Sequence, residues 1–226
     1  MIMTLAYSTL GLQHSSKLLH GGGILAAIHR NIDIVSSKFK YKCPAEILGI
    51  TLKFRDGSKL ILCNFNRVGN LGTINHHVFQ DYVRKARQRR GVTGIVIAGD
   101  LNLPGIDWQN YCSTDPVEQL FLDSFSNGIE QLITSPTHTE GNILDLVLTD
   151  KLHFISDIQI SELDTSCKSD HFALSFKGPC LYRRCSHSHY LCLFYPQVIK
   201  LHTFWHILEH HFFIRVRGKS YISFIV

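Results

Sequence analysis

A carboxylate and an amide two residues apart, Asp100 and Asn102, form the most informative chemical pattern in this sequence of 226 residues. They follow an apolar, β-branched stretch at 93–98. Alternate side chains of an extended chain share a face, so we expect both groups to look into one cleft, where they can accept a proton and donate hydrogen bonds. The surrounding Gly-Asp-Leu-Asn-Leu-Pro-Gly string is also typical of a turn. On these residues alone both interpretations stay open.

Two further strings place polar groups inside or beside apolar strands. Asp145 lies between Leu144 and Leu146, and burying an unpartnered aspartate there would cost several kcal/mol. Such an aspartate needs a partner, and a histidine is a common one. Ser-Asp-His at 169–171 precedes another apolar stretch. The alternative is that Asp145 faces solvent on a half-buried strand.

These groups need a framework of short strands and few helices. Alternating apolar residues predict a hairpin with strands at 46–54 and 59–65 around an Arg-Asp-Gly-Ser turn. Helical spacing predicts a surface helix over 76–91. Further strands are expected at 21–35, 93–98, 142–149 and 171–176. The pattern favours an α+β fold with mixed sheets.

A second helix is predicted to start at Asp115, an acidic cap followed by proline at the first helical position. The residues expected on its inner face are Leu120, Phe121, Ser124 and Phe125.

The ordered strings resemble one known group of enzymes. Their order resembles that of the motifs of the endonuclease/exonuclease/phosphatase superfamily. The resemblance is more specific to the endonuclease domain that precedes the reverse transcriptase of non-long-terminal-repeat retrotransposons. The strings that carry it are GGGILAAI, IAGDLNLPGIDW, ILDLVLTD and SDHFALSF. The resemblance covers residues 21–177. It implies a four-layer α/β/β/α sandwich of two mixed sheets, and magnesium-dependent hydrolysis of a phosphodiester in DNA.

Carried over by motif, the resemblance assigns catalytic roles to four residues. Asp145 would orient His171, which acts as general base or as a cation that contacts the phosphate. Asp100 would serve the nucleophile or the leaving group, and Asn102 would donate hydrogen bonds to the scissile phosphate.

The resemblance also implies metal and substrate contacts. Asp170 would lie on the Mg²⁺ side of the cleft, with Mn²⁺ as an alternative ion. Four residues are expected to support or contact the substrate: Asn66, Thr137, Thr139 and Ser169. Asn66 stands where the family usually carries a tyrosine.

The sequence departs from the family pattern at its N-terminal end. An asparagine-bearing strand and a strand ending in the glutamate that is the main Mg²⁺ ligand should precede Gly21, but residues 1–20 contain no acidic residue and no asparagine. We therefore expect a domain that is incomplete at the N-terminus, holds Mg²⁺ weakly and is a poor or inactive nuclease by itself.

Charge and composition divide the chain into three parts. Residues 1–177 carry 17 basic and 17 acidic residues, whereas 178–226 carry 6 basic residues and a single Glu. Global charge therefore gives no argument for a nucleic-acid partner. We expect an atypical segment at 1–20, the truncated domain at 21–177 and a non-homologous tail rich in His, Cys and aromatic residues at 178–226.

Two local clusters have alternative interpretations. The basic residues at 84–90 are a solvated helix face or a phosphate contact. The tail contains either a zinc cluster or no zinc site. The residues that could form the cluster are Cys180, Cys185, His187 and His189, and their spacing is not that of common zinc folds.

The seven cysteines lack a regular pairing pattern, which indicates reduced thiols and an intracellular chain, nuclear or cytoplasmic. The sequence contains no run of 18 apolar residues, so we do not expect a membrane span. The partner we expect is DNA, and a reverse transcriptase region is expected in the parent polypeptide. The alternatives are a phosphodiesterase or phosphatase of the same superfamily, and a non-catalytic remnant that binds nucleic acid.

Overall fold

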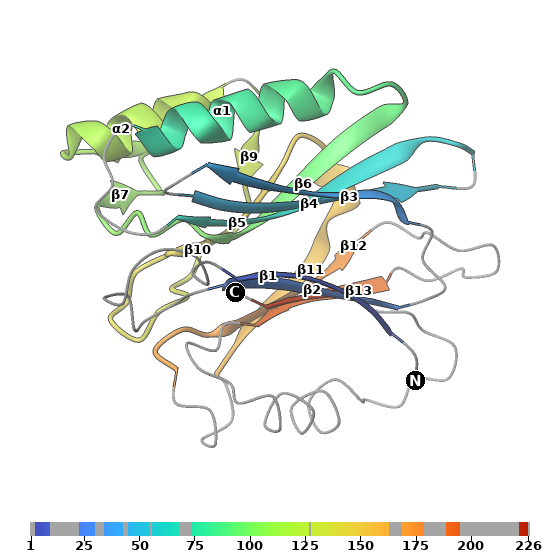
Figure 1. Ribbon diagram of the computed structural model, residues 1–226. Coiled ribbons are helices and arrows are strands. Elements are labelled where there is room, and N and C mark those ends of the chain that lie inside the picture. The colour runs from blue at the N-terminus through green and yellow to red at the C-terminus, as the bar shows by residue number, and fades with distance from the viewer. Residues whose placement is uncertain are drawn as a thin grey trace, which may run out of the picture.

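Two six-stranded sheets stack face to face, and two helices cover the outer face of one of them (Figure 1). The computed structural model describes residues 3–9, 23–29, 34–42, 45–54, 56–67, 74–126, 128–162, 169–178, 189–194 and 222–225. The fold is α+β with mixed sheets, as the sequence predicted. A second helical layer, expected from the resemblance, is not found among the described residues.

The helix-covered sheet holds the predicted hairpin. Its strand order is β3 (Ile34–Lys42), β4 (Ala45–Lys53), β5 (Lys59–Arg67), β6 (Val92–Asp100), β10 (Asp145–Thr149) and β9 (Glu130–Gln131). Only β5 and β6 pair in parallel in this sheet. The turn between β4 and β5 is built by Asp56, whose carboxylate accepts the Ser58 N–H at 2.9 Å.

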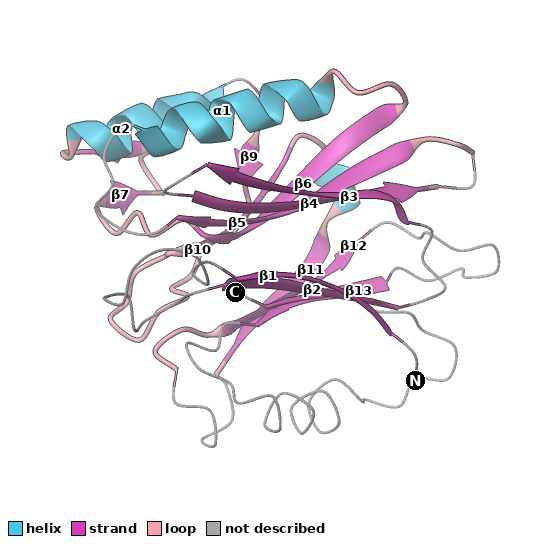
Figure 2. Ribbon diagram, viewed as in Figure 1, coloured by secondary structure: helices cyan, strands magenta, loops and turns pink. Residues whose placement is uncertain are grey.

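Helix α1 (Ile74–Arg87) and helix α2 (Pro116–Asp123) lie over this sheet (Figure 2). The predicted cap is present, because the Asp115 carboxylate accepts the N–H groups of Val117 and Glu118 at 2.7 and 3.2 Å. Phe121, Ser124 and Phe125 are buried as expected. Leu120 is 43% exposed, so its predicted inward position is wrong, and Leu122 is buried instead.

The second sheet joins distant parts of the sequence. Its order is β1 (Met3–Thr9), β2 (Gly23–His29), β14 (Ile222–Ile225), β13 (His189–Phe194), β12 (Ala173–Gly178) and β11 (Ser156–Ser161). Strands β13 and β14 come from the 178–226 segment, where the sequence showed no continuing strand pattern. The three-part division of the chain stays a prediction.

Small elements complete the described structure: β7 (Ile106–Asp107), β8 (Cys112–Ser113), and the short 3₁₀ turns η1 (Ser124–Ser126) and η2 (Leu152–Phe154). No helix in the described ranges is long and apolar enough to cross a membrane.

The two faces of the helix-covered sheet bury different sets of apolar residues. Ile97 on β6 and Leu148 on β10 pack with the helices. Ala98 and Val147 pack with Leu174 and Phe176 of β12, in the layer between the sheets. Because side chains alternate along a strand, Asp100 and Asp145 share the face that looks toward the second sheet.

Candidate active site

Two carboxylates meet where β6 ends and β10 begins. Asp100 and Asp145 are direct cross-strand partners in the antiparallel pair, and Asp145 is completely buried. Its Oδ1 atom has no hydrogen-bond partner among the described residues. A fully buried acid beside a second, partly exposed acid needs compensating positive charge.

His171 supplies that charge. Its Nδ1 lies 2.9 Å from Asp145 Oδ2, and the ring is nearly buried. Burial lowers the pKa of His171, but the hydrogen bond and charge of Asp145, together with the charges of Asp100 and Asp170, outweigh it and raise the pKa above its ordinary value. The protonated form of His171 is therefore favoured more than that of an isolated histidine.

The start of β10 is held by Thr137. This residue is fully buried, and its hydroxyl accepts the N–H groups of Leu144 and Asp145, each at 3.0 Å. The geometry gives Thr137 a role in placing Asp145, which differs from the DNA contact that the sequence indicated. Thr139 is exposed, and its predicted contact with DNA remains a prediction.

Asp100 and Asn102 form a turn and belong to the site at once. The Asn102 N–H donates to the Asp100 carboxylate at 2.8 Å, and Asn102 has a φ of 48°, a left-handed conformation that asparagine tolerates. The extended geometry expected for this pair is wrong, because β6 ends at Asp100. Arg67 braces the turn by donating to the Asn102 carbonyl at 2.5 Å.

The Asp100 carboxyl holds its proton unusually well. Burial and the neighbouring Asp145 charge raise its pKa from 3.8 to about 7, against the lowering influence of His171, the Asn102 N–H and Arg67. A carboxyl with this pKa can accept or release a proton at neutral pH.

Gly99 lets β6 approach β5 just before this carboxyl. A Cβ atom at this position would lie 2.1 Å from the Phe65 carbonyl oxygen, and the φ of Gly99 is +153°. No side chain fits without moving one of the strands.

Asp170 lies beside the imidazole on a more open side of the site. Its side chain is 47% exposed, and its Oδ2 lies 3.2 Å from His138 Nε2. Burial raises the pKa of Asp170, but the hydrogen bond from His138 and the charge of His171 outweigh it, so the pKa is lowered.

The remaining predicted residues stand around this centre. Ser169 accepts the His171 N–H through its hydroxyl at 3.1 Å, which fits the expected role in supporting the loop. Asn66 is half-buried near the end of β5. The side chains of the four zinc candidates, Cys180, Cys185, His187 and His189, lie outside the described residues.

Sequence reasoning missed two residues of the site, Arg67 and His138. Arg67 is a lone buried cation at the end of an apolar strand, and that pattern was available as a signal. His138 stands between the two predicted threonines, but only the pairing of its loop with the 169–172 loop brings it to the site.

The carboxylate cluster fits a hard divalent cation. Such ions prefer carboxylate oxygens, and Asp100, Asp145 and Asp170 supply them around one imidazole. The unpartnered Asp145 Oδ1 and the raised pKa of Asp100 both show negative charge that lacks full compensation. Ligand atoms of His138, Asp170 and His171 also lie within 4.8 Å of one another.

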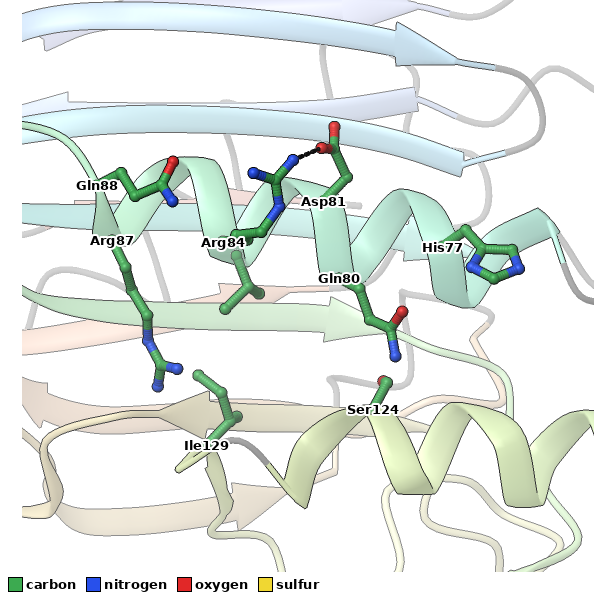
Figure 3. Close-up of a pocket in the computed structure, with 9 residues that line it drawn as sticks. His77, Gln80, Asp81, Arg84, Arg87, Gln88, Ser124 and Ile129 are labelled. Atoms are coloured by element: carbon green, nitrogen blue, oxygen red, sulfur yellow. Dashed lines mark hydrogen bonds and ion pairs between the residues drawn. The ribbon is translucent and has the colours of Figure 1, made fainter.

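Arg84 and Arg87 of α1 line a groove on the helix side of the sheet (Figure 3). This groove of about 630 Å³ lies between α1 and the segment from η1 to β9. Arg84 there pairs with Asp81 at 2.7 Å, and Arg87 pairs with Asp150 at 3.4 Å. These pairs favour the interpretation of a solvated face over a phosphate contact.

Comparison with known proteins identifies the group to which this site belongs. Residues 60–175 match the family described as endonuclease-reverse transcriptase. This chain belongs to that family. The match contains Asp100, Asn102, Asp145, Asp170 and His171, so the site lies wholly inside the endonuclease-reverse transcriptase region. A search of curated protein sequences finds no match.

One solved structure shows the same fold for this endonuclease-reverse transcriptase chain. An endonuclease/exonuclease/phosphatase family protein from Leptotrichia buccalis aligns with a TM-score of 0.52 and 15% identity, over 79% of this chain and 72% of that one. A mannosyl-6-phosphatase from Bacteroides thetaiotaomicron aligns with a TM-score of 0.41 and 13% identity, over 62% of this chain. The chain spans 64% of the length of that phosphatase.

A D. rerio TDP2 structure in complex with a single-stranded DNA product aligns with a TM-score of 0.45 and 12% identity, over 74% of each chain. At this similarity the comparison describes the backbone only. The family assignment rests on the sequence match, and the fold rests on the Leptotrichia structure.

Proposed function

We propose that this chain carries a phosphodiester-hydrolysing site of the retroelement endonuclease type, which nicks DNA with Mg²⁺ or Mn²⁺. The observation that carries the proposal is the buried Asp145–His171 pair at 2.9 Å, placed directly beside Asp100. The family description, which joins an endonuclease to a reverse transcriptase, supports DNA as the substrate.

The geometry supports a division of labour between the acids and the imidazole. With Nδ1 bonded to Asp145, proton exchange with a substrate falls to His171 Nε2. The protonated ring attracts the phosphoryl oxygens, and Asp145 holds it in position. Asp100, with a pKa of about 7, takes the proton from the attacking water. The Asn102 amide donates hydrogen bonds to the phosphate.

A divalent cation would be held by Asp170, and it would neutralise the negative charge on the phosphoryl oxygens. Binding is expected to be weak. Asp145 is already engaged by His171, Asp170 is half-exposed, and the carboxylates at the described site come from aspartates alone. Slow nicking that needs high metal concentrations follows from this donor set.

Nicking of supercoiled plasmid by the purified full chain tests the proposal. We expect slow, Mg²⁺- or Mn²⁺-dependent conversion to the open circle, which stops with EDTA and in the His171→Ala variant. His153→Ala is the matched control, because His153 is exposed and lies on η2, away from the cluster. Nicking that survives His171→Ala would refute the assignment of this site.

A second candidate is a phosphodiesterase or phosphatase of the same superfamily that acts on other substrates. The same pair of acids and imidazole serves either reaction. Bis(para-nitrophenyl) phosphate and para-nitrophenyl phosphate separate the two. Hydrolysis of these esters, with no nicking of DNA at matched metal concentration, would favour the second candidate.

The third candidate, a non-catalytic nucleic-acid-binding remnant, predicts DNA binding through the α1 basic residues. Steep weakening by salt and by replacing those residues would support it. The ion pairs of Arg84 and Arg87 argue against it.

A further inference from the structure

A second histidine–aspartate pair stands beside the first one. His138 and His171 are bridge partners on two neighbouring loops, and their rings meet edge to face with centroids 4.9 Å apart. The loops are joined by two backbone hydrogen bonds, from Thr139 N–H to the Asp170 carbonyl and from Phe172 N–H to the Thr137 carbonyl, each at 2.8 Å. His138 is therefore fixed relative to the proposed catalytic imidazole.

The hydrogen bonds of His138 determine where its ring proton lies. Its Nδ1 accepts the Glu140 N–H at 3.2 Å, so Nδ1 carries a lone pair. A neutral imidazole has one protonated nitrogen, and here that is Nε2. Nε2 lies 3.2 Å from Asp170 Oδ2 and donates its proton to that oxygen.

In this tautomer the His138 ring is not available as a metal ligand. His138, Asp170 and His171 have ligand atoms within 4.8 Å of one another, which suits a metal site by distance. An imidazole nitrogen binds a metal through its lone pair, and the only lone pair of His138 already accepts the Glu140 N–H.

We propose that His138 is a positioning residue, whose Nε2–H holds the Asp170 carboxylate in the orientation used by the active site. Asp170 needs such a partner because its side chain is half-exposed, whereas that of His138 is only 10% exposed. A fixed donor thereby restricts a carboxylate that would otherwise sample several rotamers. The inference rests on the proposed function, in which Asp170 serves the divalent cation.

The tautomer is tested first, in the metal-free full chain. Nitrogen-15 NMR of the histidine rings should show His138 protonated at Nε2 and unprotonated at Nδ1. An Nδ1–H tautomer, which leaves Nε2 without a proton to donate to Asp170, overturns the proposal. This readout does not depend on catalysis.

Two variants then separate the two nitrogens. The His138→Gln amide reaches the Nε2 position and keeps a donor for Asp170, whereas the His138→Asn side chain ends near the Nδ1 position and loses that donor. Titration with Mn²⁺, followed by electron paramagnetic resonance, should show about 10-fold weaker binding in His138→Asn. His138→Gln should stay within about 3-fold of the wild type.

Nicking assays at rising Mn²⁺ should show the same division. The His138→Asn defect should shrink at saturating Mn²⁺, because an orienting residue changes occupancy more than the reaction itself. Equal losses of Mn²⁺ binding in both variants, with melting temperatures unchanged, would make His138 a ligand and overturn the proposal. Wild-type Mn²⁺ binding in both variants would also overturn it.

Failure of the proposed function gives a different pattern. If the wild type nicks no DNA, while the Nε2–H tautomer is present and Mn²⁺ binding differs between the two variants, the role of His138 stands and the assigned reaction falls.

Discussion

The proposed chemistry depends on where two side chains, Asp100 and His171, keep their protons. Burial and the charge of Asp145 raise the pKa of Asp100 to about 7. The carboxylates of Asp145 and Asp100 raise the pKa of His171 and so favour its charged form. Each group in isolation would titrate elsewhere. Their contact makes proton transfer at neutral pH possible.

The first prediction concerns stability against pH. The folded chain binds protons at Asp100 and His171 more tightly than the unfolded chain does, so the free energy of unfolding should fall as pH rises from about 4 to about 8. For Asp100, a pKa moved from 3.8 to about 7 corresponds to a loss of about 4 kcal/mol at pH 8.

Urea denaturation between pH 5 and pH 8 in EDTA measures this slope. Asp100→Asn should flatten most of it, since an amide has no proton to lose in this range. Asp56→Asn, in the exposed turn between β4 and β5, is the control and should leave the slope unchanged. A wild-type slope of zero would contradict the proton assignment.

The second prediction isolates the contact between Asp145 and His171. Asp145→Asn removes the charge that raises the pKa of His171, so that pKa should fall below the wild-type value, as measured by NMR titration of the ring protons. Nicking should drop at least about 100-fold, the usual contribution of a positioned acid–base group. An unchanged His171 titration would show that the two side chains do not interact in solution.

Strand β10 begins where it does because of a side chain outside it. The Thr137 hydroxyl accepts two consecutive backbone N–H groups and sets the position of Asp145 opposite Asp100. Thr137→Val keeps the shape and leaves both N–H groups unpaired, which should cost about 2–4 kcal/mol in urea denaturation. Thr137→Ser keeps the hydroxyl and should cost less than about 1 kcal/mol. Equal costs in the two variants would assign the effect to packing.

Strand β6 reaches the site only because Gly99 is a glycine. Gly99→Ala places a Cβ atom against the Phe65 carbonyl and should destabilise the chain by about 3 kcal/mol or more. Gly141→Ala is the matched control, because Gly141 also has a positive φ of +87° but open space around it, so its cost should be about 1–2 kcal/mol. Thermal melts compare the two directly.

Local patterns predicted the parts of the fold that local chemistry determines. The β4–β5 hairpin follows from alternation and turn residues, and the start of α2 follows from the cap at Asp115. The partner of Asp145 came from a family resemblance, because no local rule joins positions 145 and 171. The position of His138 and the brace from Arg67 depend on contacts between distant loops, which periodicity cannot reveal.

The second sheet depends on two strands from the segment after residue 178, although the composition of that segment did not indicate such a role. Strand β13 pairs with β12, strand β14 pairs with β2, and the two pair with each other in parallel. They stand in the middle of the second sheet and join its two sides. Strands in the middle of a sheet form because both neighbours offer hydrogen bonds, even where the sequence alternates poorly.

A chain that ends at residue 178 should therefore split its second sheet into the β1–β2 and β12–β11 pairs. The β2 and β12 edges would become unpaired and prone to association. We expect aggregation in size-exclusion chromatography and a melting temperature lower by 10 °C or more, an order-of-magnitude figure for the loss of several kcal/mol. A monomeric fragment with the wild-type melting temperature would show that the tail is dispensable.

The cross-strand pair of Asp100 and Asp145 also bears on how this chain can change by mutation. Once both acids are charged, Asp100 opposes folding because it lies directly beside the buried Asp145, so an amide at position 100 is expected to make the protein more stable and less active. Asp145 differs, because its loss would leave the buried His171 without its partner. Selection for stability alone would therefore replace Asp100 first, and loss of activity and higher thermal stability should appear together.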